Sequence, residues 1–312
     1  MAPILFCALA GFQLDLNKVL VVFKKSTLQL QALEFKEPRF LKLLEEGHAS
    51  VAKVKTAHEQ HVETLELIEK ELTARNIEFQ SLHRAEIDEN TMHYDLVISV
   101  GGDGTFLDAS HSLHRVPILG VNSAPGSSFG HFCLANRSNF VKVLDSILAG
   151  QTSPSRLLRL QLELNGKLLP ELVLNEVLIA HSNPAGTSRY LITIDDYEEE
   201  QRSSGIWVGP PPGSTGAIKS AGGELMPICE QRYQFVIREA WTKPGQKFKF
   251  MKGTLSRAQK MVIISQMRTG ALYIDGQHIE YPFPLGDELV VRASEHDLIA
   301  FVDPQVNDIF SN

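Results

Sequence analysis

The chain contains Leu96-Val97-Ile98-Ser99-Val100-Gly101-Gly102-Asp103-Gly104-Thr105, an apolar run that leads directly into a glycine-rich turn. The run is almost wholly apolar, which predicts a strand buried on both faces. Strands that enter a tight turn and then a helix are typical of parallel α/β sheets, where ligands bind beyond the carboxyl ends of the strands. The segment therefore predicts a parallel sheet with a ligand site at residues 101–105.

The sequence on either side of this segment continues the same pattern. Short strands are expected at 19–23, 77–79 and 116–121. Between the first two, residues 50–76 carry apolar side chains at helical spacing, which predicts a long amphipathic helix. Strands that alternate with helices in this way indicate a parallel α/β domain.

The pattern changes after a helix-like stretch at 139–148. From Arg156 the apolar residues alternate in period two, as strands do when one face is buried. Similar strands are expected at 176–180, 190–195, 206–208, 234–238, 261–265, 271–275 and 288–292. The acidic stretch 197–200 reads as a solvated hairpin tip. Many short strands separated by turns predict an all-β second domain, a sandwich or an open barrel.

Composition limits the classes of function. Of 312 residues, 43% are hydrophobic and 21% are charged, as in ordinary globular proteins. The formal net charge of −7 argues against nucleic acid as a partner. It does not exclude an anionic ligand, because clustered backbone N–H groups hold phosphate even in an acidic protein.

Cysteine usage and hydropathy argue against a membrane protein, and export is the less favoured alternative although Ala8-Leu9-Ala10 looks like a cleavage site. Cys7, Cys133 and Cys229 are widely spaced and form no CxxC pair, so neither a zinc site nor a disulfide framework is expected. Each reads as a small buried hydrophobe. No apolar run approaches the roughly 18 residues of a membrane span. The apolar start lacks the positive residues that open a signal peptide, so we expect a cytoplasmic protein.

Asp103 is the residue in the turn that calls for a chemical explanation. Three glycines let the backbone approach a ligand and present N–H groups to phosphate oxygens. A carboxylate among phosphates repels them unless it accepts a proton from a hydroxyl group or holds Mg²⁺. The alternative is a tight turn in which Asp103 caps the next helix, which accounts for one glycine but not for three. No GxxxxGK[ST] segment is present, so a Walker-type site is not predicted.

Three later segments carry polar groups that suit a nucleotide. Asn175-Glu176 combines an amide with a carboxylate, which can bracket ribose hydroxyls or an adenine edge. The segment 209–223 begins as a proline-stiffened loop and becomes rich in small and hydroxyl residues, as a loop lining a ligand slot would. Asp275-Gly276-Gln277 follows a strand and is by itself an ordinary hairpin turn.

Taken in order, these blocks resemble the NAD kinase family. The order is Gly101 to Thr105, Asn175-Glu176, Gln201 to Gly205, Gly213-Ser214-Thr215, Ser220 to Gly223 and Asp275-Gly276-Gln277. The resemblance covers about two thirds of the chain, and several blocks in order are far more specific than one. It implies an α/β N-terminal domain with a parallel sheet and an all-β sandwich C-terminal domain.

On this basis we expect the α/β domain at 17–132 and the sandwich at 133–303, with the sandwich completing the dinucleotide site. The ends, 1–16 and 304–312, are expected to be flexible. The resemblance implies phosphoryl transfer to the 2′-hydroxyl of the adenosine ribose of NAD or NADH. ATP with Mg²⁺ or another divalent cation is the implied donor, and some members accept polyphosphate. It also implies a homodimer or homotetramer, with no membrane partner.

Carried over to this chain, the resemblance implies a role for each matching residue. Asp103 would be the base on the ribose hydroxyl, and no protein metal site is expected. The residues expected to bind the nucleotide are Gly101, Gly102, Gly104, Thr105, Asn122, Asn175, Glu176, Arg202, Ser204, Thr215, Gly216, Ala217, Ser220 and Gln277.

The chain departs from the family at two contacts to the dinucleotide. Ser204 stands where many members have an aspartate, and Ala217-Ile218 stands where an aromatic ring is usual. Arg202-Ser203-Ser204-Gly205 together with Gly130-His131-Phe132-Cys133 resembles the divergent branch that includes plant and mitochondrial NAD(H) kinases. A changed charge beside the nicotinamide favours the uncharged ring of NADH, which we state as a hypothesis.

Two other functions share part of the pattern. Diacylglycerol- and sphingosine-type lipid kinases share the Gly-Gly-Asp-Gly turn, but they usually follow it with an Asn-Asp pair. After Val121 this chain has Asn122-Ser123-Ala124 instead. A non-enzymatic dinucleotide sensor would keep the slot and lose the base, so the presence of Asp103 counts against it.

Overall fold

The computed structural model describes residues 8–9, 11–87, 91–242, 244–245 and 247–310. These residues form two compact units. Among the described residues, the parallel-sheet unit comprises those within 8–155 and 299–303, and the sandwich unit comprises those within 156–298 and 304–310. Each unit has its own core of buried apolar side chains.

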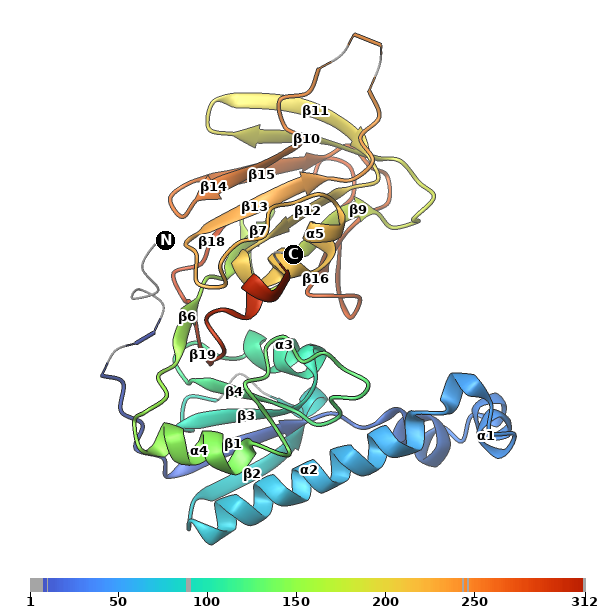
Figure 1. The fold of residues 1–312 in the computed structure, drawn as a ribbon. Coiled ribbons are helices and arrows are strands. Elements are labelled where there is room, and N and C mark those ends of the chain that lie inside the picture. The colour runs from blue at the N-terminus through green and yellow to red at the C-terminus, as the bar shows by residue number, and fades with distance from the viewer. Residues whose placement is uncertain (1–7, 10, 88–90, 243, 246, 311–312) are drawn as a thin grey trace. The chain divides into compact units, whose positions relative to one another are not determined.

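The parallel-sheet unit is built on strands in the order β2-β1-β3-β4-β19-β6, with β5 paired to β4. Their bounds are β1 Lys18–Phe23, β2 Glu78–His83, β3 Leu96–Gly101, β4 Ile118–Asn122, β5 Ala135–Asn136, β6 Ser155–Leu157 and β19 Leu298–Phe301. All residues of the central strands β3 and β4 are buried, as the apolar runs predict. Because β1, β3 and β4 run parallel, their carboxyl ends meet at one edge of the sheet (Figure 1).

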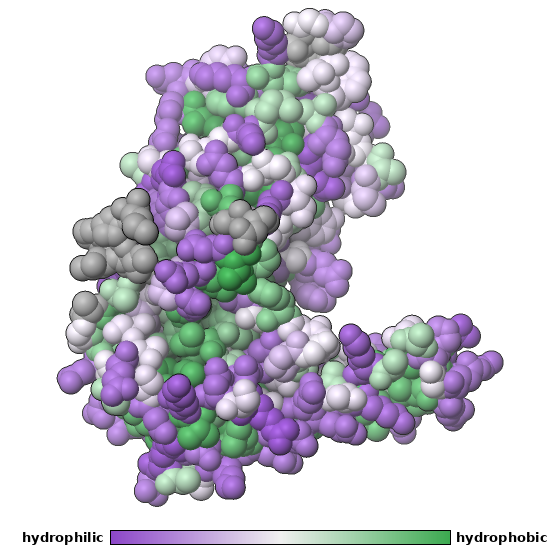
Figure 2. Space-filling view, viewed as in Figure 1, coloured by the Kyte–Doolittle hydropathy of each residue, from purple (hydrophilic) through white to green (hydrophobic). Residues whose placement is uncertain are grey.

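Helices pack on this sheet through short apolar stripes. The long helix α2 (Val54–Ala74) buries Ile68 and Leu72, and α3 (Asp103–His111) follows the glycine turn. The remaining helical segments of the unit are η2 Gln29–Glu34, α1 Pro38–Glu45, η3 Ala49–Val51, η4 Arg84–Glu86 and α4 Phe140–Leu148. Figure 1 shows α1 and the start of α2 extending beyond the sheet. Apolar residues interrupt the hydrophilic surface of this extension in Figure 2. Leu33 of η2 and Phe35 directly after it are 62% and 66% exposed.

The boundary between the units falls after Ser155, later than the expected 132/133. Strand β5 pairs with β4, and α4 buries Phe140 and Leu144 in the core of the parallel-sheet unit. A boundary at 132/133 is therefore wrong, because it would separate β5 and α4 from the sheet with which they pair and pack.

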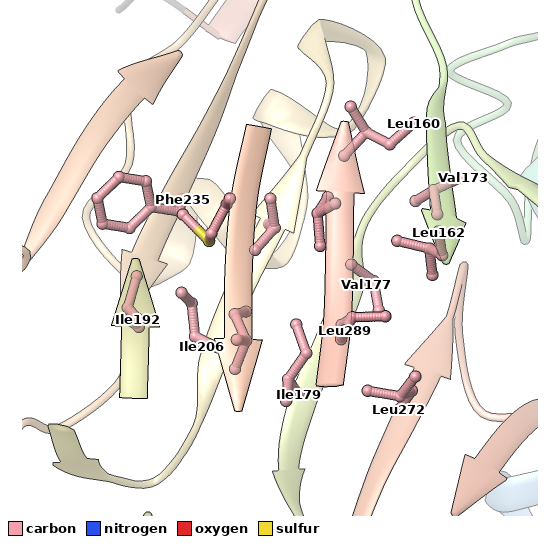
Figure 3. Packing of buried hydrophobic residues seen from close by; sticks show 14 of the residues in the cluster. Leu160, Leu162, Val173, Val177, Ile179, Ile192, Ile206, Phe235, Leu272 and Leu289 are labelled. Atoms are coloured by element: carbon pink, nitrogen blue, oxygen red, sulfur yellow. The ribbon is translucent and has the colours of Figure 1, made fainter. Parts of the chain in front are cut away.

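The sandwich unit contains two antiparallel sheets, in the orders β11-β10-β15-β18-β7-β8 and β14-β13-β12-β9-β16-β17. Their bounds are β7 Leu160–Leu164, β8 Lys167–Val173, β9 Val177–His181, β10 Ser188–Ile194, β11 Tyr197–Ser203, β12 Ile206–Gly209, β13 Arg232–Ile237, β14 Lys252–Ser256, β15 Lys260–Ser265, β16 Gly270–Ile274, β17 Ile279–Pro282 and β18 Glu288–Ala293. Leu160, Leu162 and Leu289 from one sheet and Val177, Ile179 and Leu272 from the other point into one shared core (Figure 3). The fold is thus a sandwich, as predicted.

Short helical segments follow β12 and end the described chain. These are η5 Pro211–Thr215, α5 Ala217–Ser220 and η6 Val306–Phe310. Residues 304–310 are not the flexible end that the sequence predicts, because Asn307 is only 1% exposed. Its amide donates to the carbonyls of Pro211 and Met226 at 3.1 and 2.7 Å. Residues 311–312 of that expected end lie outside the described residues.

The N-terminal expectation is also wrong where the structure describes it. Phe12 and Leu14 pack against the core of the parallel-sheet unit, and Leu16 is 8% exposed. Residues 1–7 and 10 of the expected flexible start lie outside the described residues. Their neighbours are held because an apolar segment gains more by burial than it loses in chain entropy.

Two smaller expectations differ from the structure. Residues 197–200 lie within β11 rather than at a hairpin tip, which falls at Asp195 with a φ of 53°. The Glu199 carboxylate accepts hydrogen bonds from the backbone of Lys249 and Phe250, so this acidic stretch is partly structural. Cys229 is disulfide-bonded and Cys133 is free, so the sequence-based view of Cys229 as a plain hydrophobe is wrong.

Candidate active site

The glycine turn lies at the carboxyl edge of the parallel sheet. Strand β3 ends at Gly101, which pairs in register with Asn122 at the end of β4. A Cβ on Gly101 would lie 2.2 Å from the Thr105 hydroxyl, and one on Gly102 would lie 2.4 Å from the Ser128 hydroxyl. These two glycines are required by packing within the turn. A Cβ on Gly104 would meet nothing closer than Arg84 at 4.0 Å, so this glycine leaves open space above the turn.

Asp103 is the first residue of α3 and not its cap. Gly102 occupies the N-cap position, and no side chain caps the helix there. The Asp103 carboxylate instead accepts a hydrogen bond at 2.9 Å from the backbone N–H of Phe132, far along the chain. Its second oxygen has no hydrogen bond to any residue that the structure describes. The capping alternative is therefore wrong, and a half-buried carboxylate oxygen is left available at the turn.

The loop after β4 forms the wall beside the turn. Ser123 N–H donates to the Gly101 carbonyl at 2.9 Å. Asn122, 5% exposed, donates from its amide to the Ser128 carbonyl and accepts from the backbone of Ala124. The side chain of Asn122 thus shapes this loop, a role that the sequence did not indicate.

Two basic residues at strand ends lie near the turn, and the sequence reasoning missed both. Arg84 follows β2, pairs with Asp108 of α3 at 2.7 Å and is the nearest neighbour of the open space at Gly104. Lys24 follows β1 and is close enough to Arg84 and Cys133 to interact electrostatically with both. Their positions in the sequence could have identified them, because a residue directly after a parallel strand lies at the edge of the sheet where ligands bind.

Asn175 and Glu176 occupy the sandwich unit, between β8 and β9. Asp275, at a φ of 48° in the β16–β17 turn, holds this segment in place. Its carboxylate accepts backbone hydrogen bonds from Leu174, Asn175 and Glu176 at 2.9, 2.8 and 3.0 Å. The Asp-Gly-Gln block therefore acts at this segment through Asp275, which fixes its backbone.

The loop after β12 packs tightly on the Asn-Glu segment. A Cβ on Gly213 would lie 1.7 Å from the Asn175 carbonyl oxygen, so only glycine fits there. A Cβ on Gly216 would lie 3.6 Å from the Glu176 carboxylate and 3.8 Å from the Asn175 amide. Both polar side chains therefore face the turn between η5 and α5, which carries Thr215, Gly216 and Ala217. Ser220, at the end of α5, is exposed.

Glu176 is buried, and one of its oxygens is unsatisfied. The residue is 7% exposed, and its Oε2 has no hydrogen-bond partner among the described residues. Burial, with a smaller effect from the charge of Asp275, raises the pKa of Glu176 to about 8. At neutral pH the carboxyl group is mostly protonated, so it can both donate and accept a hydrogen bond. A ligand hydroxyl or ring nitrogen would satisfy it.

Ser204 and Gln277 line a different cavity of the sandwich unit, of about 560 Å³. Trp207, Arg238 and Tyr273 also line it, and the Arg238 guanidinium lies 5.6 Å from the centre of the Trp207 ring. Asn175 and Glu176 do not line this cavity. Among its described lining residues none is acidic.

Arg202 is not among the residues that line this cavity. Its guanidinium lies 5.9 Å from the Trp241 ring and 3.8 Å from the Glu200 carboxylate, on the edge strand β11. His131, another residue at the loop beside the turn, packs edge-on against the Phe132 ring at 5.0 Å. Among the described residues, no three His, Cys, Asp or Glu side chains gather as a metal site would need. None of the described helices is long and apolar enough to cross a membrane.

Comparison with known proteins gives one consistent answer. Residues 19–152 match the family model for the ATP-NAD kinase N-terminal domain. A probable NADH kinase of Oryza sativa subsp. japonica is 35% identical over 267 residues, which cover 78% of this chain and 82% of that protein. An NADH kinase of Arabidopsis thaliana is 33% identical, over 80% of this chain and 86% of that protein.

A solved structure shares the whole fold. The crystal structure of an NAD kinase from Archaeoglobus fulgidus in complex with ATP superposes with a TM-score of 0.69 at 21% identity, covering 94% of this chain and 97% of that one. This likeness concerns the fold, whereas the identity to the plant relatives establishes descent. Together with the glycine turn at the sheet edge, they make this chain an enzyme that belongs to the NAD kinase family.

Proposed function

We propose that this enzyme transfers a phosphoryl group from ATP to the 2′-hydroxyl of the adenosine ribose of NAD or NADH. The observation that carries the proposal is the Asp103 carboxylate at the carboxyl edge of the parallel sheet. Phe132 N–H fixes one of its oxygens, and the other has no hydrogen bond to a described residue. An oriented carboxylate with a free oxygen is what a general base requires.

In the reaction the ribose 2′-oxygen attacks the terminal phosphorus of ATP, and a new O–P bond forms. The bond from that phosphorus to the bridging oxygen breaks, and ADP leaves with the electron pair. The proton of the hydroxyl passes to Asp103. A positioned base contributes a factor of about 10²–10⁴ to such a rate, and the remainder comes from orientation and charge neutralisation.

The glycine turn supports binding of the phosphate groups. The open space above Gly104 and the N–H groups at the start of α3 suit phosphate oxygens. Mg²⁺ fits this arrangement, because it is commonly held by one carboxylate together with substrate phosphates. When bound, it would neutralise charge on the transferred group. Polyphosphate offers the same groups and is the alternative donor.

For the dinucleotide we propose contacts with the Asn-Glu segment. The Asn175 amide and the buried Glu176 carboxyl supply directed donors and acceptors, and the facing turn at Thr215, Gly216 and Ala217 would line the adenosine pocket. Ser220, Ser204 and Gln277 are proposed to contact other parts of the dinucleotide. A contact from Arg202 stays a sequence-based prediction.

We further propose a preference for NADH over NAD. The cavity that contains Ser204 has Arg238 and no acidic group among its described lining residues. If the nicotinamide lies beside Ser204, a positive ring is disfavoured there by repulsion from the guanidinium. The relatives named NADH kinase are consistent with this preference.

The test is an assay of the purified protein with ATP and Mg²⁺, in which NAD and NADH are offered in parallel. Formation of NADP or NADPH is followed by chromatography, and tripolyphosphate replaces ATP in a second series. We expect product, with a higher kcat/KM for NADH. Absence of product from either acceptor would reject the proposal and favour a lipid kinase or a dinucleotide sensor. Size-exclusion chromatography with light scattering tests the expected homodimer or homotetramer, and a cytoplasmic location also stays an expectation.

A further inference from the structure

A second cavity of the parallel-sheet unit, of about 430 Å³, lies beside the first strand and the long helix. It is bounded by the segment that follows β1, by the first turns of α2 and by the loop that follows β4. Its polar lining includes Lys24, Ser26, Lys53, His58, His61 and Ser123. None of these residues was assigned a role from the sequence.

The lining carries positive charge without compensation. Lys24 and Lys53 form no ion pair with a described residue, whereas Lys25, which follows Lys24, pairs with Glu34 at 2.7 Å. No acidic side chain is among the described residues that line the cavity. Positive side chains that line a cavity without an acidic neighbour attract an anion into it. The cavity is therefore electrostatically suited to an anionic ligand.

The two histidines give this lining a fixed geometry. His61 is 3% exposed, and its Nδ1 lies 2.9 Å from the Ser123 hydroxyl. His58 Nδ1 lies 2.9 Å from the Ser26 hydroxyl. Burial lowers the pKa of His61 to about 4, so it is neutral at physiological pH. Each histidine thus holds a serine hydroxyl in place, and the lysines bring positive charge to the lining.

The surroundings of Lys24 disfavour its charged form, and a bound anion would favour that form. Burial lowers its pKa, and the positive charge of Arg84 lowers it further. A bound anion favours the charged ammonium form and reverses both effects. The first turn of α2, a helix of 21 residues, adds the partial positive charge of a helix N-terminus at Lys53 and Val54.

The cavity and the glycine turn share one wall. Ser123, Ala124 and Ser127 line the cavity, and the same loop donates from Ser123 N–H to the carbonyl of Gly101 at 2.9 Å. Arg84 links the two regions from the other side, because it neighbours both the space at Gly104 and Lys24. An elongated anion at the turn would therefore extend toward the lysines.

We propose that this cavity binds the phosphate chain of the phosphoryl donor, with Lys24 and Lys53 as its charge partners. This inference rests on the proposed function. It identifies the phosphate chain as the part of the donor that the cavity binds. The recognised group is a condensed phosphate, present in both ATP and inorganic polyphosphate. A nucleotide base is not required for this contact.

The direct test measures tripolyphosphate binding by titration calorimetry to the wild-type chain and to Lys24→Gln and Lys53→Gln. Lys55→Gln is the matched control, because Lys55 lies two residues further along α2 and does not line the cavity. Loss of one charge-assisted contact is expected to weaken binding about tenfold in each cavity variant and to leave the control unchanged. Lys53 is exposed, so its variant keeps the test valid if Lys24→Gln folds poorly.

Kinetics give the second readout. The KM for ATP is expected to rise about tenfold in both cavity variants, while the KM for the dinucleotide changes by less than about twofold. Unchanged tripolyphosphate binding in both variants would overturn the proposal, and so would equally tight binding of inorganic phosphate. If tripolyphosphate binding depends on the two lysines but no donor yields NADP or NADPH, the cavity assignment stands and the proposed function fails.

Discussion

Asp103 shows how one backbone hydrogen bond can orient a side chain. Phe132 N–H, at 2.9 Å, orients the carboxylate from a loop far along the chain. A capping aspartate would accept hydrogen bonds from the first N–H groups of its own helix, whereas here no side chain caps the helix and one Asp103 oxygen stays available at the turn. The residue is thus positioned by tertiary structure and not by its local sequence.

We predict that Asp103→Asn keeps the fold and lowers kcat by about 10²–10⁴. The asparagine oxygen can still accept from Phe132 N–H, but an amide cannot take the proton of the ribose hydroxyl. Steady-state kinetics and circular dichroism check the two parts. Asp145→Asn, at an exposed aspartate of the same unit, serves as control. A near-normal kcat in the Asp103 variant would reduce this residue to a structural role.

Glu176 leads to a prediction about pH and stability. Burial raises its pKa from the ordinary 4.5 to about 8 in the folded chain. Between these values the unfolded chain has lost the proton and the folded chain keeps it, so stability falls as pH rises. Relative to Glu176→Gln, which has no such proton, the free energy of unfolding of the wild type should fall by up to about 1.4 kcal/mol per pH unit from 4.5 to 8.

Urea unfolding of both proteins at several pH values measures this difference, because the other titrating groups cancel in the comparison. Parallel pH dependences of the two proteins would mean that water or the neighbouring amide solvates the Glu176 carboxylate in the folded state. In that case the expected donor–acceptor role of its carboxyl group at neutral pH would be lost as well.

At the residue scale the sequence predicted the polar groups better than their surroundings. Asp103, Asn175 and Glu176 were recognisable because each stands in a block with other unusual residues. Lys24 and Arg84 stand in no such block, and they become notable only when the sheet brings the ends of β1 and β2 to one edge. For Asp275 the sequence predicted only a hairpin turn. The three backbone hydrogen bonds that its carboxylate accepts come from residues about one hundred positions earlier, and only strand pairing brings these residues together.

At the element scale the loop after β12 depends on the glycine that packs against the Asn-Glu segment. We predict that Gly213→Ala destabilises the sandwich unit by about 1–3 kcal/mol or more, because its Cβ would be forced against the Asn175 carbonyl. It should also weaken dinucleotide binding, since that carbonyl lies beside the two proposed ligand contacts. Gly126→Ala is the control, because a Cβ there meets no atom within 4 Å. Thermal unfolding and fluorescence titration with NADH measure the two effects, and equal behaviour of both variants would contradict the prediction.

The elements themselves were largely predictable where their patterns are local. The apolar runs marked β1, β3 and β4, and the helical spacing at 50–76 marked α2, which the structure confines to Val54–Ala74. Strand β11 was mistaken for a turn because its acidic residues lie on an edge strand, where solvent accepts them. Hydropathy alone does not distinguish such a strand from a loop.

At the scale of the whole molecule the described chain crosses its own unit boundary three times, after residues 155, 298 and 303. It leaves the parallel-sheet unit after Ser155, and residues 299–303 return to it after the sandwich strands. Strand β19 then pairs in parallel with β4 through Ala300 and Phe301. The local sequence does not predict this pairing, because a strand of four residues is too short for its periodicity to indicate which sheet it joins. The expected domains were therefore contiguous, and the observed units are not.

This return gives Phe301 a structural role that can be tested. Its ring is fully buried in the core of the parallel-sheet unit and meets Phe12 edge-on, with ring centres 6.3 Å apart. We predict that Phe301→Ala costs about 3–5 kcal/mol, the usual loss for a buried phenylalanine. Because the ring belongs to the core of one unit, hydrogen exchange should speed up in β1, β3 and β4 and change little in β9 and β16. Ile309→Ala, at a side chain that is 58% exposed, should leave both sets of strands protected. Equal loss of protection in the two units would instead mean that they unfold as one cooperative body, and β19 would then stabilise the whole chain and not only the sheet that carries the glycine turn.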